Sequence, residues 1–158
     1  MISTSASITD SAPPLLVVED SNEDFEALNR FLSRSPHAIS VHRCINGDQA
    51  LAYLYQQGRY EEPSSAPRPG MILLDLNLPG TDGRDLLCQI KRDDRLKTIP
   101  VVVFTTSNNP KDIEACYRKG ANSYIIKPVN FNLLRQSVQT VMDYWFAIST
   151  LPQPCPEA

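Results

Sequence analysis

The segment that decides the fold is Met71-Ile-Leu-Leu-Asp75-Leu-Asn77-Leu-Pro79, near the middle of a chain of 158 residues. It opens with four apolar residues, which is the composition of a strand buried on both faces of a parallel sheet. An acidic residue, Asp75, follows this run at once. In open parallel sheets, ligands bind beyond the carboxyl ends of the strands, so Asp75 stands where such a fold carries its chemistry.

Four further apolar runs have the length of buried strands and alternate with segments of helical period. We expect these strands at Leu15–Val18, Ile39–Cys44, Val101–Phe104 and Ser123–Ile126. Five strands interleaved with helices indicate an α/β protein. The fold that we predict is flavodoxin-like, (βα)5, with a five-stranded parallel sheet in the order 2-1-3-4-5 and helices on both faces.

Local signals mark the helices between these strands. Ser21-Asn-Glu-Asp24 resembles a capping box at a helix start, and Gly120 is a helix stop. Residues 59–70 contain three prolines and two serines, which predicts a mobile surface loop. The last helix is expected from about Asn130 to Ile148, with a stripe of apolar residues facing the sheet: Leu134, Val138, Val141, Trp145 and Ile148.

The length accommodates one hydrophobic core, which we place in residues 15–150. Residues 1–14 are rich in Ser, Thr and Ala and are expected to be a disordered lead-in, and residues 151–158 form a proline-rich tail. After Ile148 only ten residues remain, so we expect no output domain and a signal passed by protein contact.

Composition argues against several classes of function. A formal net charge of −3 and an acidic pI near 5.3 disfavour nucleic acid as a partner. No apolar run is long enough to span a membrane, and the N-terminus lacks the pattern of a signal peptide. The four cysteines are scattered without a metal-binding spacing, which is typical of reduced thiols in a cytoplasmic protein.

Polar residues follow four of the five predicted strands. Because the carboxyl ends of parallel strands meet at one edge, these side chains are expected to surround one small pocket at the switch point of the sheet. The residues are Glu19, Asp20, Asp75, Thr105 and Lys127.

Each of these residues alone has an ordinary structural explanation, such as a helix cap, a strand end or a solvated charge. Together they are harder to explain, because carboxylates about 4 Å apart repel by roughly 4 kcal/mol per pair at an effective dielectric constant of 20. Lys127 supplies one compensating charge. A hard divalent cation with oxygen ligands, Mg²⁺, is the natural second. The group therefore predicts a site for a phosphoryl group and its metal.

The segments that carry these residues resemble the receiver domains of two-component response regulators. The resemblance runs from about Leu15 to Ile148, and the motifs occur in the family's order and spacing. They are Val17-Val-Glu19-Asp20-Ser21, Leu73-Leu-Asp75-Leu-Asn77-Leu-Pro79, Asp82-Gly83, Val103-Phe-Thr105-Thr-Ser107 and Ile126-Lys127-Pro128.

The resemblance implies a role for each site residue. Asp75 would accept a phosphoryl group from a histidine kinase, in a signalling protein that catalyses its own Mg²⁺-dependent phosphorylation and dephosphorylation. Asp20 and Asp75 would bind the metal directly, Asn77 would bind it through its carbonyl, and Glu19 would act through a water. The implied catalytic residues are Asp75, Thr105 and Lys127, and the implied metal ligands are Glu19, Asp20, Asp75 and Asn77.

Two features of the family extend this interpretation. Tyr124 resembles the aromatic switch whose ring moves with Thr105, although an amphipathic aromatic at a sheet edge would look the same. The family also has a cis peptide before the proline equivalent to Pro128, whereas an X-Pro bond is trans by default. Glu19 departs from the commoner Asp at that position, which affects the water-mediated metal contact and leaves the phosphoacceptor unchanged.

A narrower resemblance points to the cyanobacterial phytochrome response regulators, the phosphoacceptors of light-sensing histidine kinases. It rests on the proline-bearing loop before Met71, the segment Asn77-Leu-Pro-Gly-Thr-Asp-Gly-Arg-Asp85, and Asp143-Tyr-Trp-Phe before Thr150-Leu-Pro. The expected partner is therefore a phytochrome-like kinase.

Three other classes fit less well. A haloacid-dehalogenase-like phosphatase needs a second Asp two residues after the nucleophile, where this chain has Asn77. A Rossmann domain needs a glycine-rich turn after its first strand, and here Glu19-Asp20 follows. A pseudo-receiver would lack chemistry, yet every catalytic position is filled.

The chain is also expected to form a homodimer through its fourth helix, fifth strand and fifth helix, as many receivers do. Trp145 continues the stripe of the last helix, whereas Phe146 lies about 100° away, beside Met142. A single sheet-facing stripe accommodates only some of these aromatics, so we expect one of the two faces to meet another molecule.

Overall fold

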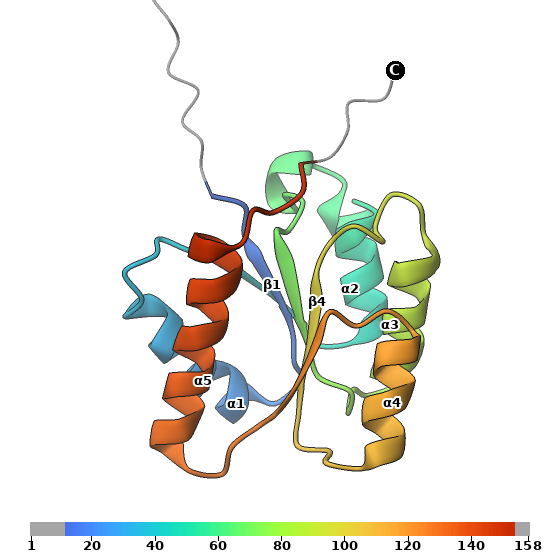
Figure 1. Ribbon diagram of the computed structural model, residues 1–158. Helices are drawn as coiled ribbons and strands as arrows, with labels where there is room; N and C mark the ends of the chain where they lie inside the picture. The colour runs from blue at the N-terminus through green and yellow to red at the C-terminus, as the bar shows by residue number, and fades with distance from the viewer. Residues whose placement is uncertain (1–11, 154–158) are drawn as a thin grey trace, which may run out of the picture.

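The computed structural model describes residues 12–153, which form an α/β structure with a central sheet between two layers of helices (Figure 1). All five strands are parallel and lie in the order β2-β1-β3-β4-β5, which confirms the predicted topology. The strands are β1 (Leu15–Val18), β2 (Val41–Cys44), β3 (Met71–Leu74), β4 (Val101–Thr105) and β5 (Ser123–Ile126). The predicted disordered lead-in and the end of the tail lie largely outside the described residues.

The helices cover the two faces unequally. They are α1 (Asn22–Ser33), α2 (Gly47–Leu54), α3 (Gly83–Arg92), α4 (Pro110–Arg118) and α5 (Phe131–Asp143). Figure 1 shows α1 and α5 on one side of the sheet and α2, α3 and α4 on the other. Within the described part of the chain, no helix is long and apolar enough to cross a membrane.

Alternation along the buried strands divides the core into two halves. In β1 and β3, successive side chains point to opposite faces, so Leu16 and Leu74 pack with the core under α2–α4. Leu15 and Leu73 pack with the core under α1 and α5. Both faces of the central strands are apolar and buried, which is why these strands read as continuous runs in the sequence.

Short polar side chains begin the helices and so fix where each strand end gives way to a helix. Ser21 accepts a hydrogen bond from the backbone N–H of Asp24 at 3.2 Å, as the predicted capping box requires. Asn46, Asp82, Asn109 and Asn130 cap α2, α3, α4 and α5 in the same way.

The segment 59–70, predicted to be a mobile surface loop, exposes residues 61–65 and is anchored to the protein on either side of them. It contains two 3₁₀ turns, Gly58–Tyr60 and Pro63–Ser65, and buries Tyr60 and Ala66 in the core. The hydroxyl of Tyr53 donates to the carbonyl of Pro67 at 2.7 Å. The proline and serine content correctly indicated a loop. Composition alone does not show that Tyr60 and Ala66 of this loop pack in the core, because that depends on distant elements.

The last helix runs from Phe131 to Ile148, as predicted, but its final turn is not α-helical. The α-helix stops at Asp143 and continues as a π-helical turn over Tyr144–Ile148, which rotates the following side chains. Ile148 is therefore exposed instead of facing the sheet. Met142 precedes this turn and is buried on the same face of α5 as Val138, four residues earlier. Trp145 and Phe146 both pack against the core under α5, so the assignment of one of them to a separate face was wrong.

Candidate functional site

The site lies at the carboxyl ends of β1, β3, β4 and β5, and the sheet itself places its residues. The hydrogen-bond ladder continues one residue past β1, β3 and β5. The backbone N–H of Glu19 donates to the carbonyl of Cys44 at 3.0 Å, and that of Asp75 donates to the carbonyl of Val18 at 3.1 Å. The backbone N–H of Lys127 donates to the carbonyl of Thr105 at 2.7 Å. These residues are thus held by backbone bonds before their side chains interact.

Lys127 is the centre of the site. Its Nζ donates to Oε1 of Glu19 at 2.6 Å, to Oδ2 of Asp75 at 2.9 Å and to Oδ2 of Asp24 at 2.9 Å. The side chains of Lys127, Glu19 and Asp75 are all buried, with 9%, 6% and 9% of their surface exposed. The ammonium therefore compensates two buried carboxylates at once, as predicted from their crowding.

Asp75 is additionally oriented by its own loop. Its Oδ1 accepts a hydrogen bond from the backbone N–H of Asn77 at 3.1 Å, which leaves Oδ2 for Lys127. Gly83 permits this loop to lie against α3, because a Cβ at that position would be 2.5 Å from the carbonyl oxygen of Asp75 and 2.6 Å from the Cα of Leu76. A side chain at Gly83 would displace the Asp75 loop.

The electrostatics of the pair keep Asp75 ionised. Burial alone would raise the pKa of Asp75, but hydrogen bonds with Glu19 and Lys127 outweigh burial and hold the pKa below its ordinary value. Burial, together with the neighbouring Asp75, raises the pKa of Glu19 to about 8. The three carboxylates raise the pKa of Lys127 against the effect of burial. The carboxylate of Asp75 is thus charged at neutral pH.

Two buried polar atoms have no hydrogen-bond partner in the described part of the chain: Oε2 of Glu19 and Oγ1 of Thr105. Such orphaned atoms cost free energy unless a ligand satisfies them. Thr105 ends β4, two residues beyond Val103, and Val103 pairs with Tyr124 on β5. Because side chains alternate along strands, Thr105 and Tyr124 lie on the same face of the sheet, the one covered by α4.

Oxygen ligands for a cation are present. One carboxylate oxygen each from Glu19, Asp24 and Asp75 lies within 4.8 Å of the others. The structure brings in Asp24, for which the sequence predicted only a place in the helix cap. Its position three residues after the cap, in the first turn of α1, was the available signal, because that turn starts at the end of β1.

The structure does not bring every predicted residue into this cluster. Asp20 is exposed, and its backbone carbonyl accepts a hydrogen bond from Arg43 at 3.2 Å. Asn77 is exposed and contributes its backbone N–H to Asp75. Tyr124 is half-buried and donates its hydroxyl to the carbonyl of Ser107 at 2.9 Å. The peptide before Pro128 is trans, unlike the cis bond that the family resemblance implied.

Comparison with known proteins agrees with this geometry. Residues 15–139 match the model of the response regulator receiver domain family. Response regulator Rcp1 of Synechocystis sp. (strain ATCC 27184 / PCC 6803 / Kazusa) is 44% identical over 147 residues, which cover 90% of this chain and 97% of that protein. The probable methanogenesis regulatory protein FilR2 of Methanothrix harundinacea (strain 6Ac) is 39% identical, over 89% of this chain and 88% of its own.

Solved structures give the same result. The phosphorylated cyanobacterial phytochrome response regulator RcpA has a TM-score of 0.85 at 40% identity, covering 90% of this chain and all of that one. The Mn²⁺-bound form of Rcp1 has a TM-score of 0.84 at 42% identity, covering 89% of this chain and 99% of that one. The chain therefore belongs to the response regulator receiver domain family of two-component signalling, where it is similar to the cyanobacterial phytochrome response regulators.

Proposed function

We propose that this chain accepts a phosphoryl group on Asp75 from a sensor histidine kinase and passes the signal on by protein contact. The observation that carries the proposal is the buried, ionised carboxylate of Asp75, with the ammonium of Lys127 2.9 Å from its Oδ2. Phosphoryl transfer requires chiefly positioning and neutralisation of charge, and this pair supplies both.

The chemistry that the residues can perform is an in-line displacement. A carboxylate oxygen of Asp75 attacks the phosphorus of a phosphohistidine, the P–N bond breaks, and its electron pair returns to the imidazole. Lys127 and the hydroxyl of Thr105 then contact oxygens of the transferred group. The unpartnered Oγ1 of Thr105 supports this role, because a phosphoryl oxygen would satisfy it. The protein thereby acts on itself and has no external substrate to release.

The donor set fits Mg²⁺. The carboxylates of Glu19 and Asp75 are hard oxygen ligands, and Oε2 of Glu19 has no partner in the described residues. We propose that Asp20, Asp75 and the carbonyl of Asn77 hold the ion and that Glu19 acts through a water. Asp20 is exposed and has no ion pair in the described part of the chain, so its carboxylate is available. When bound, Mg²⁺ supplies further neutralisation of the phosphoryl oxygens.

The surface beside the site suits a protein donor. A cavity of about 150 Å³ opens next to Lys127 and Pro128 and is lined mainly by apolar side chains. Val129 in the same loop is fully exposed, and Phe131 and Leu133 at the start of α5 are about half exposed. Exposed apolar residues around a polar site are typical of a protein-protein contact. The similarity to phytochrome response regulators leads us to propose a phytochrome-like kinase as the donor.

We further propose a homodimer through α4, β5 and α5, regulated by phosphorylation. β5 is an edge strand, and Ile126 at its end and Tyr117 on α4 are each about half exposed. Thr105 and Tyr124 share the face next to α4, so a phosphoryl group that engages Thr105 can shift Tyr124 and this surface. We place these events in the cytoplasm, in line with the free thiols of Cys44 and Cys116.

The test of phosphoacceptance is direct. Purified protein incubated with acetyl phosphate and Mg²⁺ should gain the mass of one phosphoryl group, ~80 Da, and chelation of the metal should prevent it. Asp75→Asn keeps the size and loses the nucleophile, so it should gain no mass. A variant that still gains that mass would place the phosphoacceptor elsewhere. Phosphotransfer from a purified phytochrome kinase, compared with one from an unrelated pathway, tests the proposed partner.

A further inference from the structure

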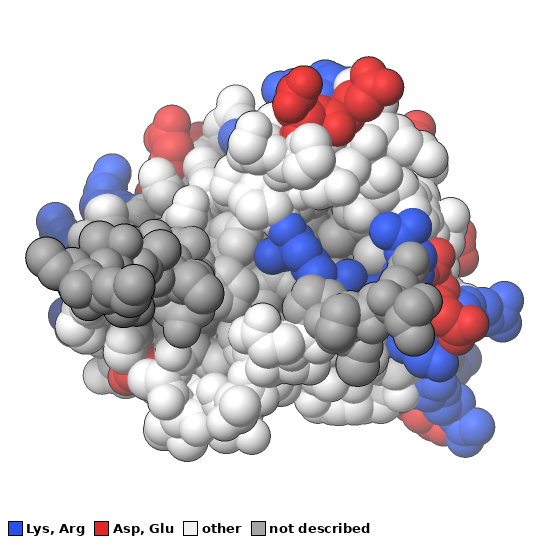
Figure 2. All heavy atoms as spheres, turned by 90° about the horizontal axis from the view of Figure 1, so that it is seen from above, with Lys and Arg blue, Asp and Glu red and all other residues white. Residues whose placement is uncertain are grey.

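A second cavity lies at the opposite edge of the sheet from Asp75, where β3 and β4 begin. Its volume is about 570 Å³, which is within the range of small-molecule binding sites. In Figure 1 this edge is at the top, and Figure 2, seen from above, shows Lys and Arg side chains beside a hollow on this face. The walls come from α2, the segment before β3, the turn before β4 and the start of the tail at Pro152.

The inner walls of the cavity are apolar and rigidly placed. Tyr53, Leu96 and Ile99 each expose no more than 3% of their surface, so they form a preformed wall and not a flexible flap. The hydroxyl of Tyr53 is already bonded to the carbonyl of Pro67, which leaves its ring as part of the apolar lining. Leu54 adds a further apolar side chain at the rim.

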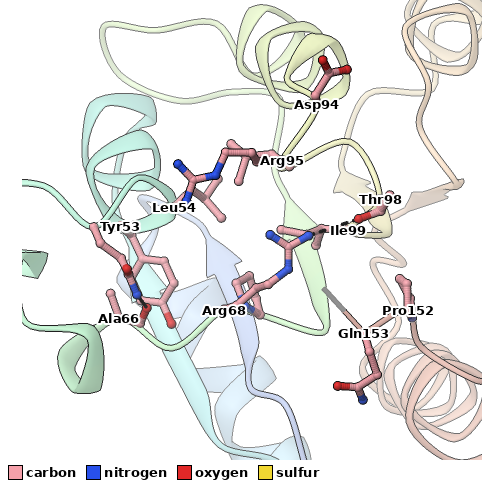
Figure 3. Close-up of a pocket in the computed structure, with 13 residues that line it drawn as sticks. Tyr53, Leu54, Ala66, Arg68, Asp94, Arg95, Thr98, Ile99, Pro152 and Gln153 are labelled. Carbon is pink, nitrogen blue, oxygen red and sulfur yellow. Dashed lines mark hydrogen bonds between the residues drawn. The ribbon is translucent and has the colours of Figure 1, made fainter. Parts of the chain in front are cut away.

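Two arginines reach into this space without a carboxylate partner. Figure 3 shows the guanidinium groups of Arg68 and Arg95 extending into the same cavity. Arg68 donates to Oγ1 of Thr98 at 3.1 Å. In residues 12–153, neither guanidinium forms an ion pair, and the nearby Asp94 pairs with Lys97 instead, at 2.9 Å.

The positive charges of the two arginines are unfavourable for each other. Burial, followed by the nearby charge of Arg95, lowers the pKa of Arg68. Two like charges that share one partly buried space repel each other, and an anion between them would remove that cost. Guanidinium groups bind carboxylate and phosphate oxygens in a forked geometry that Lys cannot reproduce.

We propose that this cavity binds a small organic anion whose carboxylate or phosphate head is held by Arg68 and Arg95. The volume exceeds what an inorganic anion fills, so an apolar or aromatic body would lie against Leu54 and Ile99. A four-residue strand, β3, separates this cavity from Asp75, a distance of roughly 13 Å at 3.3 Å per residue. The ligand therefore does not compete with the phosphoryl site, and its binding does not depend on the proposed function.

The experiment is a titration of the ¹⁵N-labelled full chain, followed by NMR in the presence of EDTA so that no metal joins the probe to Asp75. The probes are phenyl phosphate and benzoate, and benzyl alcohol is the neutral control. We expect saturable shifts at the amides of Arg68, Thr98 and Ile99, with a dissociation constant below about 1 mM for at least one anion. Benzyl alcohol should bind at least about tenfold more weakly, because it lacks the charge that the guanidinium groups recognise.

Two variants and a matched control complete the test. Arg95 is exposed, so the Arg95→Gln variant should fold normally. Arg95→Gln and Arg68→Gln should each weaken binding of the anion by at least about tenfold. Arg118→Gln removes an equally charged but remote side chain on α4 and should leave the affinity unchanged. The proposal is overturned if neither anion gives saturable shifts, if the shifts occur away from this cavity, or if Arg118→Gln weakens binding as much as Arg95→Gln does.

Discussion

The Nζ of Lys127 lies 2.9 Å from Oδ2 of Asp75, although 52 residues separate them in the chain. The contact joins the ends of β5 and β3, with the end of β4 between them. The same ammonium also donates to Glu19 at the end of β1, so it links three strands at the edge of the sheet that carries the proposed site. The same contact stabilises the fold and holds the carboxylate of Asp75, the proposed phosphoacceptor, in its ionised form.

Loss of this ammonium should destabilise the protein. Lys127→Gln leaves two buried carboxylates without compensation and should lower the free energy of unfolding by about 3 kcal/mol at neutral pH. Mg²⁺ should restore more stability in the variant than it adds to the wild type, because the cation no longer competes with the ammonium. Urea unfolding with EDTA or Mg²⁺ measures both effects. Lys97→Gln removes a solvent-exposed ion pair and should cost less than about 0.5 kcal/mol. Equal losses in the two variants would contradict this account.

The acidic residues should differ in their importance for the metal. Asp24 already pairs with Lys127, whereas Asp20 is exposed and has no ion pair in the described residues. Asp20→Asn should therefore weaken Mg²⁺ binding by about tenfold or more, and Asp24→Asn by less. Metal titrations of the two isosteric variants give the order directly. A larger loss in Asp24→Asn would assign the metal to the cluster of Glu19, Asp24 and Asp75 instead.

Substitutions of Thr105 should affect the stability of the protein and its response to phosphorylation differently. The buried hydroxyl of Thr105 has no partner, so Thr105→Val should leave the free energy of unfolding unchanged or raise it by up to about 1 kcal/mol. The same variant should lose the response of Tyr124 to a phosphoryl mimic. Thr105→Ser keeps the hydroxyl and loses a buried methyl, so it should cost about 1 kcal/mol and retain the response. Urea unfolding and the NMR signals of Tyr124 report the two properties. A response that survives in Thr105→Val would remove Thr105 from the switch.

Stability should depend on pH through Lys91. Burial lowers the pKa of Lys91 to about 8, while its Nζ donates to the carbonyls of Lys97 and Ile99. Between about pH 8 and the ordinary value of 10.5, the unfolded chain binds more protons than the folded one, so stability rises with pH. The cost of the buried charge is complete below pH 8 and disappears above 10.5.

Lys91→Met carries no such charge, which makes it the reference. The free energy of unfolding of the wild type, minus that of Lys91→Met, should increase by up to about 3 kcal/mol between neutral pH and pH 10. Urea unfolding at a series of pH values measures the difference, and effects of other titrating groups cancel in it. Two parallel curves would show that the folded and unfolded states hold the Lys91 proton equally well.

The proposed dimer makes a prediction about Ile126. Replacement by Lys at this exposed end of β5 should weaken self-association by at least about tenfold, because it places a charge in an apolar contact. A phosphoryl mimic with Mg²⁺ should shift the affinity of the wild type by about 1–3 kcal/mol. Sedimentation at several concentrations measures both. Ile45→Lys, just past the end of β2 at the opposite edge of the sheet, is the matched control, because Ile45 is also about half exposed. A wild type that stays monomeric in both states would remove the dimer.

The sequence by itself determined the strands and the positions of the chemistry. Four-residue apolar runs are local signals, and in a parallel sheet the residue after each run must emerge at one common edge. For this reason the sequence alone places Glu19, Asp75, Thr105 and Lys127 at one edge of the sheet. The starts of the helices are also predictable from local sequence, because each depends on one capping side chain such as Ser21.

Only the tertiary structure decided which side chains meet across long distances. The contact of Asp24 with Lys127 depends on the direction in which α1 leaves β1, and spacing along the chain does not encode that direction. The exposure of Ile148 depends on a π-helical turn at the end of α5, which breaks the periodicity used to predict the buried face. The cavity of Arg68 and Arg95 likewise exists because two loops meet at the amino ends of β3 and β4. Local sequence sets where an element begins and ends, whereas the packing of distant elements selects the partners of each side chain.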